Sequence, residues 1–120
     1  MPRFVVLTHD HPQLHWDLML EEGDVLRTWR LASPPTSSGP IDAEALPDHR
    51  PMYLDYEGPV GDNRGTVTRF DSGTYELVQE LPDSLVVRLF GIRLNCTAML
   101  VRAMSLSKWL FTLDAPKSES

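Results

Sequence analysis

Cysteine is almost absent from this sequence: Cys96 is the single one in 120 residues. A lone cysteine cannot form an internal disulfide and offers no thiolate cluster to a structural metal. We therefore expect a reducing, cytoplasmic compartment, with Cys96 as a small packed side chain. The chain also lacks a long apolar run, which excludes a bilayer-spanning helix and predicts no role at a membrane.

Lysine is scarce, and acidic residues outnumber cations of either kind. Nine of the 11 cations are arginine, against 17 acidic residues, so the formal net charge is −6. This balance excludes a protein that coats nucleic acid through bulk positive charge. It is compatible with an enzyme that binds a single phosphate group, because arginine suits bidentate phosphate recognition. No internal repeat, P-loop or dinucleotide-binding fingerprint is present.

Short apolar segments separated by turn residues run through most of the chain. The composition, 42% hydrophobic and 23% charged, is typical of a globular protein. We expect one domain over residues 1–114 and a disordered polar tail at 115–120. Seven to nine strand-like segments recur at a spacing of roughly ten residues, as in sandwiches and barrels. The sequence therefore predicts an all-β fold, an antiparallel sandwich or barrel with a long Pro-rich loop and little helix.

Turn signals divide the chain into hairpins and loops. Residues 14–31 predict a hairpin around Glu22-Gly23-Asp24. Residues 32–51 contain five prolines and predict a long loop, with one helical turn at 41–46. A short strand is expected at 52–56, and a second hairpin turn at 71–73.

Chemistry-bearing side chains gather near the start of the chain. Three of the four histidines lie within the seven residues 9–15, and Asp17 follows. In an extended strand His15, Asp17 and Met19 share one face, directed at solvent or into a polar cavity, while Leu14, Trp16, Leu18 and Leu20 form the core face. Two imidazoles and a carboxylate suit Mn²⁺, Zn²⁺ or Fe²⁺. Exposed polar residues on an edge strand are the plainer alternative.

Several motifs occur together in a specific order. They are His-Asp-x4-His-x-Asp-Leu-x-Leu-Glu (His9 to Glu21), Asp48-His49-x3-Tyr53-x3-Glu57-Gly58, Val25-Leu26-x2-Trp29, Gly65-Thr66-Val67 and Asp71-x-Gly73-Thr74. In this order and spacing the chain closely resembles the 3′-phosphoesterase module of bacterial DNA ligase D, over nearly its whole length. That family trims 3′ ends during non-homologous end joining.

The resemblance implies a fold, a function and a site. The fold is a small antiparallel β-barrel. The function is a metal-dependent 3′-phosphoesterase that trims DNA or RNA 3′ ends, with ligase or polymerase components of end joining as partners. The site is a barrel cavity that holds Mn²⁺, or alternatively Zn²⁺, on His9, His15 and Asp17. His49 and Tyr53 are implied to complete the phosphate site as catalytic residues.

The sequence also departs from the family where cations are usual. Met19 stands where the family usually has an arginine, residues 32–35 lack the usual lysine, and Ile41 replaces another arginine. We expect an arginine at position 19 to be tolerated, because its neighbours on that face are polar. The candidates to replace the missing cations are Arg27, Arg30, Arg50 and Arg64.

Two other functions remain open. A relative without catalytic activity would bind metal or DNA ends within a repair assembly. A non-haem iron oxygenase would use His15, Asp17 and His49 as a facial triad.

Overall fold

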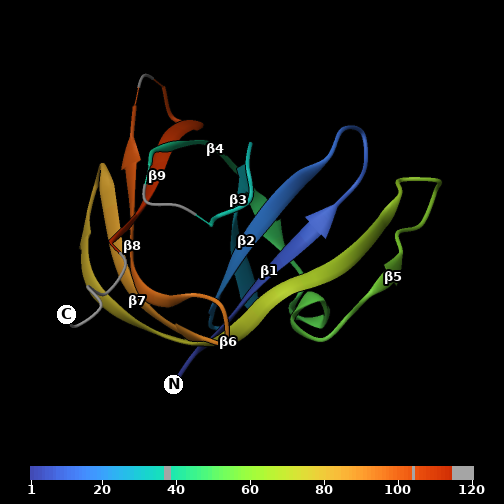
Figure 1. The fold of residues 1–120 in the computed structure, drawn as a ribbon, viewed down its shortest axis with the longest axis horizontal. Helices are drawn as coiled ribbons and strands as arrows, with labels where there is room; N and C mark the ends of the chain where they lie inside the picture. Colours follow the sequence, from blue (N-terminus) through green and yellow to red (C-terminus); the bar gives the residue numbers. More distant parts are fainter. Residues whose placement is uncertain (37–38, 104, 115–120) are drawn as a thin grey trace.

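The computed structural model describes residues 1–36, 39–103 and 105–114, and its strands form one antiparallel sheet. The strands are β1 (Arg3–His9), β2 (His15–Glu22), β3 (Val25–Leu31), β4 (Ile41–His49), β5 (Gly58–Pro59), β6 (Thr66–Leu81), β7 (Ser84–Gly91), β8 (Asn95–Arg102) and β9 (Lys108–Asp114). Their spatial order is β1-β2-β3-β4-β9-β8-β7-β6-β5, and β6 also pairs with β1. Eight strands therefore close into a barrel, with β5 added to β6 outside the ring (Figure 1). The prediction of a small antiparallel β-barrel is confirmed.

Helix is nearly absent, also as predicted. Within the described ranges the helical element is the 3₁₀ helix η1 (Pro51–Leu54). No helix of that part of the chain has the length and apolarity needed to cross a bilayer. The expected disordered tail at 115–120 lies outside the described residues.

The barrel interior is filled by one apolar cluster drawn from strands on every side. Leu18 and Leu20 of β2 belong to it and are at most 1% exposed. Phe4 of β1 and Phe111 of β9, which come from opposite sides of the eight-stranded ring, belong to the same cluster. An eight-stranded barrel is just wide enough for side chains to fill its interior. A site for a ligand must therefore lie outside this core.

The outward side chains of β1, β2 and β3 form a second surface, which we call the outer wall. Part of it is covered by a smaller apolar cluster in which Met19 packs with Leu7 and with Leu54 of η1. In Figure 1 η1 lies beside these strands, outside the barrel. The end of the outer wall that this cluster does not cover carries the polar side chains described below.

Three local predictions between residues 32 and 56 are wrong. The long loop expected over 32–51 ends where β4 begins at Ile41, and the expected helical turn at 41–46 is the start of β4, which pairs with β3 and with β9. Its burial alternates, with Ile41 and Ala43 inside and Asp42 and Glu44 exposed, so sheet pairing overrides the helix-favouring composition. The expected strand at 52–56 is instead η1, which begins at Pro51, where the fixed φ of proline suits a first helical position.

The hairpin turn predicted at 71–73 is also wrong, because β6 runs without a break through these residues. Asp71 is 4% exposed and accepts hydrogen bonds from the backbone N–H groups of residues 92–94, across the β7–β8 connection. Gly73 lies against the backbone of Phe90, where a β-carbon would collide. Both residues therefore lie where β6 changes its pairing partner from β1 to β7, and their contacts hold the β7 side against β6 there.

Candidate functional site

His9, His15 and Asp17 lie together on the outer wall. His9 ends β1, His15 begins β2, and the two face each other as the last pair of the β1–β2 ladder. Asp17 is two residues further along β2 and so shares the face of His15. One ligand atom from each residue lies within 4.8 Å of the other two. The structure thus brings together the three residues that the sequence motif selects, on the outside of the barrel wall and not in its filled interior.

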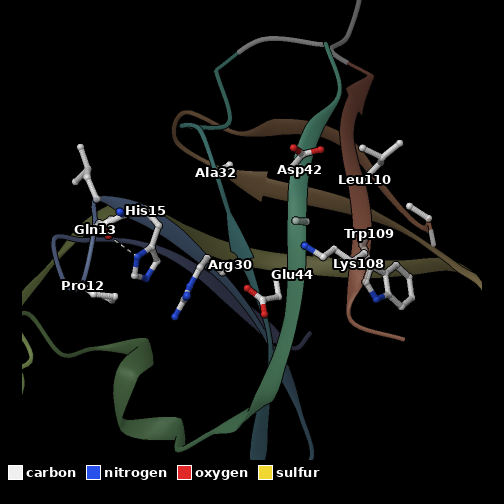
Figure 2. Close-up of a pocket in the computed structure, with 13 residues that line it drawn as sticks. Pro12, Gln13, His15, Arg30, Ala32, Asp42, Glu44, Lys108, Trp109 and Leu110 are labelled. Carbon is white, nitrogen blue, oxygen red and sulfur yellow. Dashed lines mark hydrogen bonds between the residues drawn. The ribbon is translucent and has the colours of Figure 1, made fainter. Parts of the chain in front are cut away.

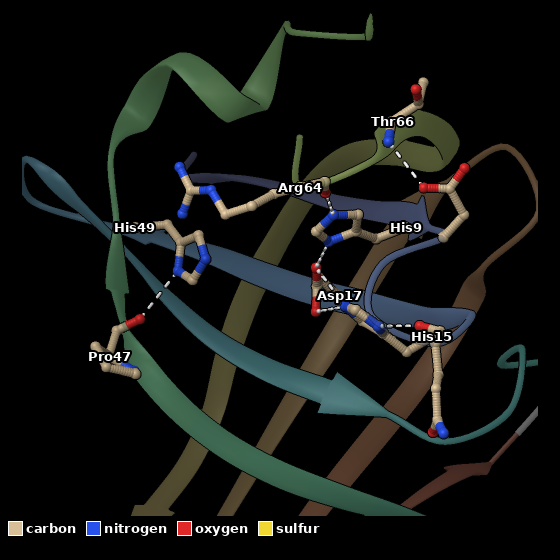
Figure 3. A network of polar contacts seen from close by, with 9 residues as sticks. His9, His15, Asp17, Pro47, His49, Arg64 and Thr66 are labelled. Carbon is tan, nitrogen blue, oxygen red and sulfur yellow. Dashed lines mark hydrogen bonds and ion pairs between the residues drawn. The ribbon is translucent and has the colours of Figure 1, made fainter. Parts of the chain in front are cut away.

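Backbone carbonyls fix the hydrogen on each imidazole. Nε2 of His9 lies 2.8 Å from the carbonyl oxygen of Arg64, and Nδ1 of His15 lies 2.8 Å from that of Gln13. A carbonyl only accepts, so these nitrogens carry the hydrogens. In the neutral rings Nδ1 of His9 and Nε2 of His15 are left with lone pairs, and both face Asp17 (Figure 3).

The carboxylate of Asp17 is short of hydrogen-bond donors although it is 3% exposed. Its Oδ1 has no hydrogen-bond partner. Its Oδ2 lies 3.3 Å from Nε2 of His15, which donates to it only when that ring is doubly protonated. His9 Nδ1 lies 3.5 Å from Oδ2. Two ring lone pairs and a buried carboxylate therefore converge, an arrangement that a cation would satisfy. The donor set fits a divalent transition metal, and the carbonyls behind the rings match the supporting contacts usual at such sites.

The pKa of His15 reflects the same crowding. Burial lowers it, but the charge of Asp17, the Gln13 carbonyl and the hydrogen bond that Nε2–H of the protonated ring donates to Asp17 together raise the pKa above its ordinary value. A proton therefore competes with any cation for this position.

His49 and Tyr53 stand across a cavity of about 470 Å³ from these residues. His49 ends β4, and its Nδ1 lies 2.9 Å from the carbonyl oxygen of Pro47, which leaves Nε2 free to face the cavity. Tyr53 belongs to η1, and its ring centre is 5.9 Å from that of His49. The chain bends at Pro51, where η1 begins, and this bend brings the two side chains together.

The outer wall is less polar than its sequence pattern predicts. His15 and Asp17 are 5% and 3% exposed, so they form the floor of the cavity and do not project into solvent. Met19, on the same face, is 2% exposed and packs in the apolar cluster under η1. Leu14, expected on the core face, precedes β2 and is 57% exposed. The expectation of a polar neighbourhood at position 19 is therefore wrong.

Other parts of the site have no signal in the sequence. Fixing of the histidines depends on carbonyl oxygens, which every residue carries. Gly65 has a φ of +83° and lies so close to Asp10 and His11 that a β-carbon would collide with them. This approach sets the Arg64 carbonyl against His9. Cys96 is buried outside the site, as expected, and burial raises its thiol pKa.

Comparison with known families matches residues 7–102 to the DNA ligase D 3′-phosphoesterase domain. The chain belongs to this family. The matched residues include all five site residues selected from the sequence, together with β2 to β8 and the end of β1. No curated protein matches the chain.

Proposed function

We propose that this protein is a metal-dependent phosphoesterase that removes phosphate or a ribonucleotide from nucleic-acid 3′ ends. The observation that carries the proposal is the convergence of His9, His15 and Asp17 on the cavity floor, in a chain of this family. The carbonyls behind both rings and the unpartnered carboxylate oxygen support a cation there.

A divalent ion, Mn²⁺ in first place and Zn²⁺ as the alternative, would bind to Nδ1 of His9, Nε2 of His15 and the carboxylate of Asp17. Such an ion polarises a phosphoryl oxygen and lowers the pKa of a water. The residues around it have separate tasks: the Arg64 and Gln13 carbonyls hold the two rings in the orientation that presents these nitrogens. Asp17 supplies the negative charge of the set.

His49 and Tyr53 act on the substrate from the opposite wall. Nδ1–H of His49 donates a hydrogen bond to the Pro47 carbonyl, so a doubly protonated His49 would present its Nε2–H to the cavity. This group donates a hydrogen bond to the developing charge or protonates the leaving oxygen. The Tyr53 hydroxyl donates to the same phosphate, since the two rings are neighbours.

The biological setting follows from the family. We propose that the protein serves end repair by non-homologous end joining in the cytoplasm, with ligase or polymerase components as partners. A catalytically inactive, end-binding relative is the second candidate, and the apolar packing of Met19 favours it because that position supplies no cation. The iron-oxygenase alternative required His49 as the third ligand. Among the described residues the cluster with His15 and Asp17 is completed by His9 and not by His49, which argues against that alternative.

The test combines turnover with metal binding. Primers ending in a 3′-phosphate or a 3′-ribonucleotide are incubated with the protein and Mn²⁺, with EDTA as the metal-free control. Asp17→Asn should abolish Mn²⁺ binding and turnover together. His49→Ala should keep Mn²⁺ affinity and lose turnover by about 10²–10⁴-fold, as for other general acids and oxyanion donors.

Three results would contradict the proposal. Turnover that persists in EDTA would exclude the metal, and stoichiometric Mn²⁺ binding by a His15→Ala, Asp17→Ala variant would exclude the assigned ligands. End binding without turnover by the Mn²⁺-loaded wild type would establish the inactive relative instead.

A further inference from the structure

Four arginines are candidates for the cation that this site lacks at position 19, and the structure separates them. Arg27 is engaged elsewhere, within 3.5 Å of Glu22 and 3.1 Å of Glu80. Arg50 and Arg64 line the cavity of the proposed metal site, but both are exposed, and Nε of Arg64 already donates to the carbonyl of Gly61. Arg30 differs from these three.

Arg30 is held in the middle of the site. It lies on β3 directly opposite Asp17 of β2, so its side chain projects from the same outer wall, beside the proposed metal ligands. It lines two cavities, the one shared with His49 and a second of about 560 Å³ between β3, β4 and β9. Figure 2 shows Arg30 between His15 and Glu44 in the second cavity.

The guanidinium of Arg30 is only partly satisfied. Its Nε is buried and has no hydrogen-bond partner, and the described part of the chain offers Arg30 no ion pair. A buried donor on a charged group without an acceptor is destabilising unless an anion or water supplies one.

The chemistry of the cavity identifies the anion. Arg30 and the three residues of the proposed metal site line one cavity, and a phosphate has enough oxygens to contact an arginine and a metal ion together. The fork of an arginine binds two oxygens of a phosphate at once. Arg30, Arg50 and Arg64 against Asp17 and Asp48 make the lining more positive than a chain whose net charge is −6.

We propose that Arg30 binds the terminal phosphate of the substrate and determines the preference for a 3′-phosphate over a 3′-hydroxyl end. The inference rests on the proposed function, of which it specifies the phosphate-binding side chain. Arg30 makes from β3 the contact that Met19 cannot make from β2.

The experiment measures recognition of phosphate apart from turnover. Two single-stranded oligonucleotides, identical except for a 3′-phosphate or a 3′-hydroxyl, are titrated in EDTA, and fluorescence anisotropy gives their affinity ratio. Arg30→Gln should reduce the preference for the phosphate by about 10–100-fold, the range of a hydrogen bond to a charged group. Mn²⁺ affinity, measured by calorimetry, should not fall. Arg88→Gln, which removes the same charge outside both cavities, should leave the preference unchanged.

The Arg30→Lys variant tests whether a loss of preference in Arg30→Gln comes from a folding defect. It keeps the charge and loses the fork, so we expect an intermediate preference at an unchanged melting temperature. A wild-type preference in Arg30→Lys, or in a folded Arg30→Gln, would overturn the inference. No phosphate preference in the wild type would overturn it as well. Preference without turnover in Mn²⁺ would leave Arg30 as assigned and refute the proposed function, whereas turnover with an unaffected Arg30→Gln would do the reverse.

Discussion

The two faces of β2 are equally buried but differ in what covers them. Leu18 is 0% exposed and Asp17 is 3% exposed, although they are neighbours in sequence. Leu18 meets side chains from the far side of the barrel. Asp17 meets two imidazoles and forms part of the floor of a cavity. Low exposure alone therefore does not distinguish a core residue from a site residue here. The difference is whether apolar side chains or a cavity with polar lining lies above the residue.

The outer wall repeats this difference within one face. Met19 and Asp17 both line the cavity, but Met19 packs in the apolar cluster with Leu54 of η1, whereas Asp17 lies against two imidazoles. The short η1 thus contributes to the apolar part of the wall. Its end at Leu54 also places Tyr53 over the polar part.

The same substitution on the two faces of β2 should have the largest and most unequal effect. Leu18→Arg places an unpaired charge in the closed core and should cost about 5 kcal/mol or more, comparable with the whole stability of a small domain. Met19→Arg should cost about 1–3 kcal/mol, because the cluster is overpacked but the guanidinium can reach the cavity. Urea unfolding followed by tryptophan fluorescence measures both losses. Equal losses would show that Met19 belongs to the core proper.

Gly65→Ala should disturb the polar part of the outer wall and not the barrel core. A β-carbon at this position, where φ is +83°, collides with Asp10 and His11 and moves the Arg64 carbonyl away from His9. Loss of such a supporting contact typically lowers metal affinity by about 10–100-fold. Calorimetric titration with Mn²⁺ is the measurement. Gly61→Ala is the matched control, since its β-carbon meets nothing within 4 Å. Equal Mn²⁺ affinity in both variants would mean that the carbonyl does not orient His9.

Asp55→Asn should have the smallest effect, on the attachment of η1 to the wall. Arg3 of β1 binds Asp55 at 2.6 Å, and this hydrogen bond holds the pKa of Asp55 below its ordinary value. A lowered pKa stabilises the fold above the ordinary titration range of aspartate, and the contribution is lost as the pH falls through the lowered pKa. The wild type should therefore melt slightly above Asp55→Asn at neutral pH, with the difference closing in acid. A constant difference across pH would show that the carboxylate charge does not matter.

Much of the fold could be predicted because its pattern is local. Alternation in β2 places Leu18 and Leu20 on one face and His15 and Asp17 on the other, and Gly23 supports the turn into β3. The failures occur where distant contacts decide. Residues 41–46 look helical in isolation, but β3 and β9 provide strand partners on both sides.

The candidate site divides in the same way. The sequence by itself determined the all-β fold and the shared face of His15 and Asp17, because the side chains of a strand repeat every two residues. It also determined the motif order that marks the family. Only the tertiary structure decided that His9 joins that face, that the Arg64 carbonyl, 55 residues away, orients its ring, and that Arg30 stands opposite Asp17. Register and closure of the barrel set these contacts, and neither is written in any local stretch of the chain.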